Sequence, residues 1–326
     1  MRGAEGGRSR YDRPLEAGEW RFSFGVRWDP MTRLAHGREV LTFDELAARF
    51  PEAAEHGDAR ATRWTSVLTA RRAVSDRTEL GLAVPLRRVD VTTDTDDEHH
   101  RRETLEGLGD LRASVRHFLV AEEEFQLAGT VGVSVPTGRI RPLTAASWLD
   151  HDEAAALGVE VPEHSHLRLG TGTWDPLLGI EALWFPADSR WLGWAGLDAV
   201  IPVFENRYDY RTSPSVRLVA GPAVRLGGGR AVLGLFAETS WSGRDRFDGA
   251  SVVGPGGTFP GDLAVPNTGR FQVAAAPSLT YALSDAFVLD LRLRIPVHTR
   301  IREDPTDGDV QLVEPIGIGF TVVWAP

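Results

Sequence analysis

The sequence predicts an all-β fold, a closed antiparallel transmembrane β-barrel of about twelve strands. Three observations predict this class: long runs alternate apolar with polar side chains, the connections between runs alternate short with long, and tryptophans lie near the ends of runs. The alternation is clearest in AFVLDLRLRIPV, residues 286–297, where Asp290, Arg292 and Arg294 occupy every second position. Because successive side chains on a strand point to opposite faces, one face of this run is apolar and the other is charged.

Further runs of this kind extend along the chain. Clear alternation occurs at 19–28, 124–135, 270–283 and 315–324, and weaker alternation at 62–74, 77–90, 109–120, 174–185, 189–204, 214–226 and 230–242. Each run is about 10–14 residues long, which suits a tilted strand that crosses a bilayer. Strands of soluble proteins are typically about 5–6 residues long, so the lengths favour a membrane barrel.

The connections between the runs alternate in length. Short connections lie near 75–77, 121–123, 186–189, 227–230 and 284–285, and long ones at 29–61, 91–108, 136–173, 205–213, 243–269 and 298–309. Transmembrane barrels have short periplasmic turns and longer extracellular loops. We therefore expect an N-terminal periplasmic segment, 1–18, and a single barrel domain, 19–325. An even number of strands places both termini on the periplasmic side.

Two of the long connections carry helix signals. TFDELAARF, residues 42–50, begins with Thr42 and has Glu45 three residues later, which is the capping-box pattern. TAASWLDHDEAAALG, residues 144–158, is rich in alanine and leucine and ends at Gly158, a typical C-cap. We expect both segments to form short helices on the outer rim.

The tryptophans near the ends of runs suit a membrane interface. They are Trp20, Trp28, Trp64, Trp174, Trp184, Trp191, Trp241 and Trp324. Aromatic girdles are expected where a barrel leaves the hydrocarbon layer. The alternative is that bulky aromatic residues only close off the ends of a sheet.

Composition excludes several classes of function. The formal net charge of -10 argues against nucleic acid as the main partner. The absence of cysteine removes disulfides, thiolate metal sites and a cysteine nucleophile. The sequence has no stretch of about 20 apolar residues that could form a transmembrane helix. Residues 1–20 lack the apolar centre of a secretory signal, which is the main feature that favours a soluble protein over a barrel.

Three segments stand out as motifs. They are GLGDLRASVRHFL at 107–119, VGVSVPTGR at 131–139 and LGTGTWDPLLGIEALW at 169–184, each a run with its flanking turn residues. Together they resemble the outer-membrane proteins assigned to the MetA pathway of phenol degradation, often labelled simply as transporters. This resemblance implies an outer-membrane β-barrel and a role in the uptake of aromatic or other hydrophobic compounds. Outer-membrane barrels commonly end on an aromatic residue, whereas here two residues follow Trp324.

The polar faces of the runs supply the candidate site. The residues expected to line the lumen are Arg21, Arg27, Arg71, Glu79, Arg87, Arg112, Arg116, Glu181, Asp198, Arg217, Arg225, Glu238, Asp290, Arg292 and Arg294. Charges are costly against lipid, so these side chains must face a wet or paired interior. Two interpretations carry about equal weight. One is an electropositive path that favours anions such as aromatic carboxylates; the other is a network of arginine–carboxylate pairs that fills a narrow barrel.

Other chemistry is weakly indicated. DTDDEHH at 94–100 and EHSH at 163–166 could bind a divalent cation, but solvated charged loops explain them better. The segment LRLGTGTWDP lacks the spacing of a dinucleotide-binding loop. We therefore predict no metal, no cofactor and no catalytic residue.

The function that the sequence favours is an outer-membrane channel for passive uptake of small, aromatic or hydrophobic solutes, with lipid and the solute as partners. Three alternatives stay open. A structural or plugged barrel would not transport. A barrel-borne hydrolase would need a serine, a histidine and an acid converging at one strand end. A soluble β-sandwich that binds a ligand would leave the alternation of connection lengths unexplained.

Overall fold

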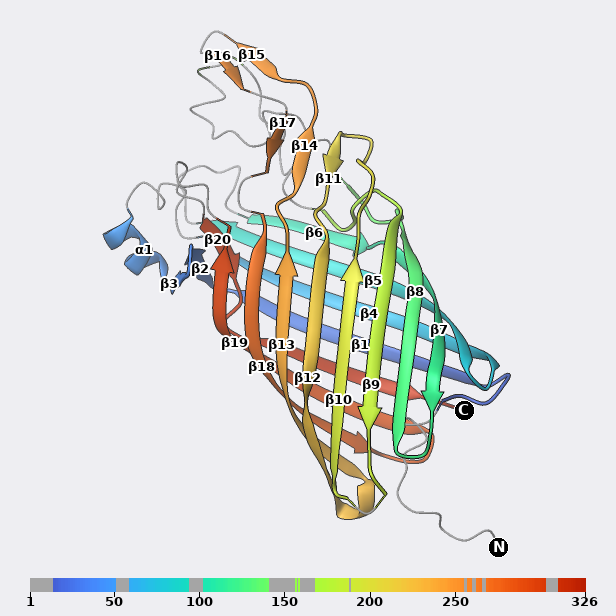
Figure 1. Ribbon diagram of the computed structural model, residues 1–326. Helices are drawn as coiled ribbons and strands as arrows, with labels where there is room; N and C mark the ends of the chain where they lie inside the picture. The colour runs from blue at the N-terminus through green and yellow to red at the C-terminus, as the bar shows by residue number, and fades with distance from the viewer. Residues whose placement is uncertain are drawn as a thin grey trace, which may run out of the picture.

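The computed structural model describes residues 14–50, 59–93, 102–140, 156, 158, 168–187, 189–254, 257–259, 262–265, 268–302 and 310–326. Twelve long strands form a closed antiparallel barrel (Figure 1). They are β1 (Trp20–Met31), β4 (Ala59–Ser75), β5 (Thr78–Thr93), β7 (Leu111–Ala121), β8 (Phe125–Val135), β9 (Asp175–Trp184), β10 (Trp191–Val200), β12 (Ser215–Leu226), β13 (Ala231–Ser242), β18 (Arg270–Ala282), β19 (Phe287–Ile301) and β21 (Gly317–Trp324). Each strand pairs with the next in this order, and β21 pairs with β1 to close the barrel.

Shorter elements lie in the connections. They are β2 (Arg33–His36), β3 (Glu39–Leu41), α1 (Phe43–Arg49), β6 (Arg102–Leu108), β11 (Tyr210–Arg211), the 3-10 helix η3 (Gly227–Gly229), β14 (Arg246–Asp248), β15 (Val252–Gly254), β16 (Gly257–Phe259), β17 (Asp262–Ala264) and β20 (Val310–Val313). All of them except η3 lie at one end of the barrel, which we call the loop end (Figure 1). The opposite end, the short-turn end, holds the tight turns, the beginning of β1 and the end of β21.

The predicted helix at 42–50 is confirmed as α1. Its N-cap Thr42 accepts a 3.2 Å hydrogen bond from the backbone of Glu45, and the Glu45 carboxylate accepts a 2.7 Å bond from the Thr42 backbone. This reciprocal pair satisfies two backbone donors that the first turn of a helix leaves open. The predicted helix at 144–158 lies almost entirely outside the described residues, as do the loops 94–100 and 163–166 and most of segment 1–18.

Strand register explains the alternation in the sequence. On β19, Leu291 pairs with Leu279 of β18 and Phe320 of β21, and all three side chains are exposed. The next residue, Arg292, pairs with Ser278 and Gly319 instead. Because directly paired residues point to the same side of a sheet, the apolar positions form one continuous outer face and the polar positions form the inner face.

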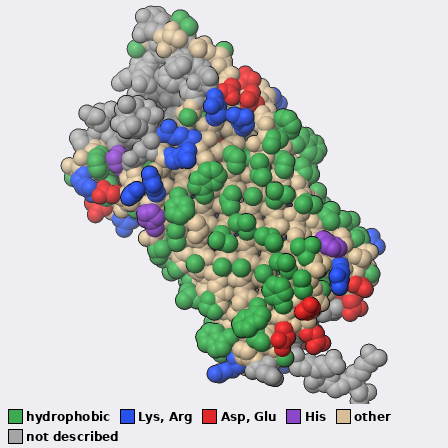
Figure 2. Space-filling model, in the orientation of Figure 1, with side chains coloured by type: hydrophobic (Ala, Val, Ile, Leu, Met, Phe, Trp, Pro, Cys, Tyr) green, Lys and Arg blue, Asp and Glu red, His purple; other side chains and the backbone are tan. Residues whose placement is uncertain are grey.

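The outer surface is that of a membrane barrel. Figure 2 shows hydrophobic side chains over the middle of the barrel wall, with charged side chains gathered toward its two ends. Trp20, Trp184, Trp191 and Trp324 are exposed near the short-turn end, and Trp64 and Trp241 are exposed toward the loop end. An apolar band between two aromatic girdles is the pattern of outer-membrane barrels, and we place the chain in the outer membrane.

Among the described helices, none is long and apolar enough to cross a membrane.

The predicted fold is confirmed, because each predicted run corresponds to one barrel strand. Several predicted bounds are wrong. The barrel strands β4 and β19 have 17 and 15 residues and extend into the connections predicted at 29–61 and 298–309. The connection predicted at 91–108 contains β6, which pairs with the half of β5 that lies toward the loop end. Leu105 of β6 is buried against Val89 and Val91, so apolar alternation continues past the barrel into this hairpin.

Candidate functional site: the barrel interior

The candidate site is the inner face of the barrel. In the strand register, Arg21 lies directly opposite Arg71, Glu79 opposite Arg116, and Asp198 opposite Arg217. The other predicted lumen residues occupy inner positions of the same register: Arg27, Arg87, Arg112, Glu181, Arg225, Glu238, Asp290, Arg292 and Arg294. The pairings therefore put these side chains on the face opposite the apolar belt. That they line a path for a solute stays a prediction.

A network of paired charges occupies the inner face toward the loop end. Arg294 donates a 2.7 Å hydrogen bond to Glu238 and forms a second ion pair with Glu314. Arg217 also pairs with Glu238 at 2.8 Å, and Arg270 pairs with Glu314 at 3.4 Å. We call these five residues the ion-pair network. Each carboxylate has two arginine partners, because Arg294 is shared between them. Three arginines thus meet two glutamates, and the network keeps one positive charge in excess.

Glu314 belongs to the chain just before β21, outside the strands that span the membrane. Burial raises the pKa of its carboxyl, but the charges of Arg270 and Arg294 outweigh burial and hold this pKa below its ordinary value. The network is extended by Gln272, which is fully buried and donates a 3.0 Å hydrogen bond to Thr299. A second cluster lies on β1 and β4, where Asp29 accepts hydrogen bonds from Arg27 at 2.7 Å and Arg63 at 3.1 Å.

Sequence reasoning identified Arg217, Glu238 and Arg294 of this region but missed Arg270, Gln272 and Glu314 beside them. It also missed Asp29 and Arg63 of the second cluster. Gln272 and Arg270 lie at alternate positions of β18, so the period-two pattern carries a signal for them. No periodic signal marks Glu314, because it lies between strands.

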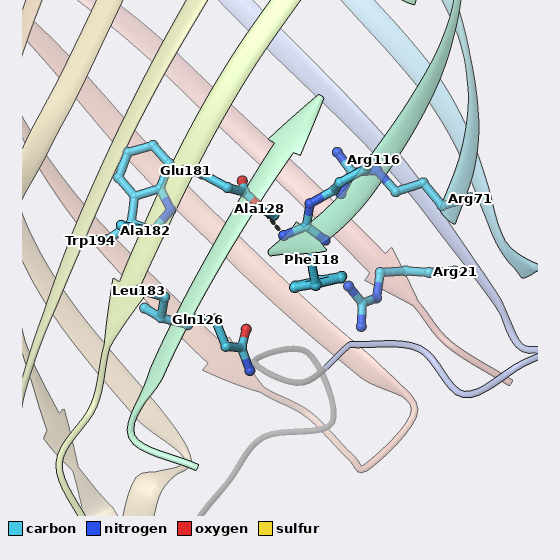
Figure 3. Close-up of a pocket in the computed structure, with 10 residues that line it drawn as sticks. All are labelled: Arg21, Arg71, Arg116, Phe118, Gln126, Ala128, Glu181, Ala182, Leu183 and Trp194. Carbon is cyan, nitrogen blue, oxygen red and sulfur yellow. Dashed lines mark ion pairs between the residues drawn. The ribbon is translucent and has the colours of Figure 1, made fainter. Parts of the chain in front are cut away.

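A cavity of about 260 Å³ lies on the inner face near the short-turn end (Figure 3). We call it the arginine cavity, and its lining comprises Arg21, Arg71, Arg116, Phe118, Gln126, Ala128, Glu181, Ala182, Leu183 and Trp194. Arg116 forms ion pairs with Glu181 across the cavity and with Glu79 at 3.1 Å, and its guanidinium lies 4.3 Å from the centre of the Phe118 ring. In Figure 3 the three arginine side chains converge around Phe118. The cavity is therefore both cationic and partly aromatic.

A second cavity, of about 190 Å³, adjoins the first, because Leu183 and Trp194 line both. We call it the aromatic cavity; the remainder of its lining is Phe185, Leu192, Ala223, Arg225, Val232, Phe236, Ser278, Thr280, Asp290 and Arg292. The rings of Trp194 and Phe236 meet edge to face, with centroids 5.9 Å apart. An apolar wall with a few polar groups is the usual composition of a small-molecule site.

The three sequence motifs meet at the loop end. Asp110 of the first motif accepts a 2.8 Å hydrogen bond from the backbone of Gly138 in the second. Its other oxygen accepts bonds from the backbone and hydroxyl of Thr171 in the third motif, at 2.7 Å and 3.0 Å. The same hydroxyl lies 2.8 Å from a carboxylate oxygen of Asp175 at the start of β9, so its single proton is shared between the two carboxylates. The motifs thus fasten two extracellular connections to the barrel rim, which gives them a structural role.

Comparison with known proteins bears on the fold. No family model matches the sequence, and no curated protein matches it. An outer membrane channel from Pseudomonas putida F1 is 12% identical, with 100% of both chains covered and a TM-score of 0.63. The deltaS2S3 mutant of the TodX monoaromatic hydrocarbon channel is 10% identical, with 97% of this chain and 93% of that chain covered and a TM-score of 0.48. The beta domain of the Bordetella autotransporter BrkA is 9% identical, with 95% and 100% covered and a TM-score of 0.47.

The likeness to the Pseudomonas channel shows a shared barrel fold over the whole chain. Membership of the MetA-pathway family stays a resemblance, since no family model supports it. The chain is an outer-membrane β-barrel whose inner face carries two adjoining cavities and a network of paired charges.

Proposed function

We propose that the chain is an outer-membrane channel for passive uptake of small aromatic or other hydrophobic solutes. The observation that carries this proposal is the pair of adjoining cavities inside a closed barrel, which are lined by aromatic and cationic side chains. A solute in such a cavity contacts aromatic rings and charged side chains, whereas lipid contacts only the apolar outer face of the barrel. The Pseudomonas putida neighbour is itself named an outer membrane channel, which supports the same proposal.

Diffusion through the barrel requires no chemical step, so we propose no enzymatic activity. Solutes would be selected by the width of the interior and by the charge of its lining. The arginine cavity and the aromatic cavity would hold the solute near the short-turn end. The ion-pair network would restrict movement toward the loop end, because its side chains hold one another in place on neighbouring strands.

The proposal is tested by reconstituting refolded protein into liposomes and recording the entry of small aromatic solutes. Refolding is first checked by gel mobility with and without boiling, because a closed barrel migrates as a compact band that shifts on heating. We expect protein-containing liposomes to admit the solutes faster than empty liposomes. Ala223→Trp should slow entry, because Ala223 lies in the aromatic cavity.

The matched control is Ala220→Trp on the same strand. Ala220 pairs with Ala195 and Ala237 on the outer face, so its tryptophan should contact lipid and leave entry unchanged. Equal entry into empty and protein-containing liposomes would overturn the proposal.

A structural barrel without transport is the second candidate. The ion-pair network favours it, because paired charges can fill a narrow interior and hold its shape. This candidate predicts that liposomes stay impermeable and that planar bilayers show no conductance. It also predicts that Ala223→Trp and Ala220→Trp behave alike in every transport assay.

A further inference from the structure

We propose that the aromatic cavity is a binding site for single-ring aromatic carboxylates, with the ring against Trp194 and Phe236 and the carboxylate on Arg292. This inference rests on the proposed channel function and narrows its solute class from aromatic compounds in general to anionic ones. It is carried by three features of the cavity: its apolar wall, the buried Nε atom of Arg292 and the excess of positive charge in the lining.

The apolar wall borders a cavity with room for one ring. Val219, Ala223, Phe236 and Ala276 form a buried cluster on the inner face, with Leu192, Trp194 and Val232 packed against it. A cluster of this kind is unusual on a barrel face that is otherwise polar, and it borders the cavity rather than the lipid. Apolar cavities of about 150 Å³ can hold benzene. The volume of about 190 Å³ therefore accommodates one ring with a small substituent.

Arg292 supplies the polar end of the site. Its guanidinium carbon lies 5.6 Å from the centre of the Phe236 ring, so the charge is held at the edge of the apolar wall. The Nε atom of Arg292 is buried and has no hydrogen-bond acceptor within the described part of the chain. Its direct register partners, Ser278 and Gly319, are small and carry no charge. A carboxylate could accept from this guanidinium in the bidentate geometry that arginine favours.

The charge of the lining also favours an anion. Two arginines, Arg225 and Arg292, and one acid, Asp290, line the aromatic cavity, which leaves one positive charge in excess. Asp290 accepts a 2.7 Å hydrogen bond from Thr280, so this carboxylate already has a partner on the neighbouring strand. A bound carboxylate would neutralise the excess charge. A neutral hydrocarbon would fill the same apolar wall but leave the buried Nε atom of Arg292 without an acceptor.

The test is calorimetric titration of the detergent-refolded barrel with benzoate and, separately, with its neutral analogue benzyl alcohol. We expect benzoate to bind more tightly than benzyl alcohol. Arg292→Gln should weaken benzoate binding by about tenfold or more, because a charge-assisted pair is lost. The same change should leave benzyl alcohol binding nearly unaltered. Phe236→Leu should weaken the binding of both ligands, because both use the ring wall.

The matched control is Arg300→Gln, which removes the same charge from β19 at an exposed position on the outer face. It should leave benzoate binding unchanged. Gel mobility of each variant before and after boiling shows whether it has folded. The proposal is overturned if benzyl alcohol binds as tightly as benzoate, or if Arg292→Gln and Arg300→Gln have equal effects on folded protein. Because binding is measured without transport, a barrel that binds benzoate but admits no solute into liposomes would refute only the channel function.

Discussion

A Cβ atom on Gly170 would lie 2.2 Å from the Oδ1 atom of Asp110, although the two residues come from different motifs. No carbon can approach an oxygen to which it is not bonded so closely, and the position therefore requires glycine. The neighbouring Gly138 is equally confined, since its Cβ would lie 2.7 Å from the backbone of Gly170. The rim of the barrel thus depends on the absence of side chains at two points where separate connections meet.

Gly170→Ala is expected to destabilise the barrel by about 1–3 kcal/mol, because Asp110 must move and its hydrogen bonds to Gly138 and Thr171 are disturbed. The control is Gly129→Ala on β8, where an added Cβ meets nothing within 4 Å. The measurement is the urea midpoint of unfolding in lipid vesicles. If both variants unfold at the same urea concentration, the close contact is not a structural requirement.

Leu291→Arg is expected to cost about 2–4 kcal/mol, because it places a charge on the outer face against lipid. Leu291 is 41% exposed and pairs with apolar residues on both neighbouring strands. The control is Leu291→Ala, which shortens the side chain without adding charge. Equilibrium unfolding from vesicles gives both values. Equal stability of the two variants would mean that this face does not contact the bilayer.

Arg294→Met should destabilise the barrel by about 3 kcal/mol, because it removes a buried partner from both Glu238 and Glu314. The loss stays at the lower end of the usual range since Arg217 and Arg270 still pair with these carboxylates. Arg225→Met serves as the control, because no ion pair joins this inner-face arginine to another described residue. A loss of stability shared equally by the two variants would contradict the ion-pair network.

Protonation of Glu314 should make the stability of the folded barrel depend on pH in the acidic range. Its pKa in the folded chain lies below the ordinary value of 4.5, so its contribution is complete above pH 4.5 and is lost as the pH falls further. We expect the melting temperature of the wild-type chain to fall across this acidic range. Glu314→Gln should flatten that fall, because the variant has no carboxylate to protonate. Identical pH profiles would show that Glu314 is not stabilised by its arginines.

The alternation of apolar and polar residues was sufficient to predict the twelve barrel strands, although not all of their bounds. Arg292 and Leu291 could be assigned to opposite faces because the period of a strand is two. Partnerships between strands were not predictable in the same way. Arg294 meets Glu238 from 56 residues away, and Thr171 meets Asp110 from 61 residues away. Only the register and the path of the connections decide such pairs, and neither follows from local pattern.

The cavities were also beyond prediction from sequence. Trp194 is an inner-face residue on β10 that belongs to an ordinary strand pattern, and nothing in that pattern distinguishes it from the tryptophans of the outer girdles. Its role follows from the edge-to-face contact with Phe236, which requires β10 and β13 to be brought together with β12 between them. The sequence indicated a charged interior, either an electropositive path or a network of ion pairs, but not where the apolar part of that interior lies.

The arginine cavity lies close to one mouth of the barrel, and the ion-pair network lies toward the other. At each end three arginines lie beside two acids: Glu79 and Glu181 at the first, Glu238 and Glu314 at the second. Fixed positive charge in excess near both mouths enriches a water-filled pore in anions. Any current through this barrel would therefore be carried mainly by anions. With a salt gradient across an artificial bilayer, the reversal potential would take the sign that the anion sets.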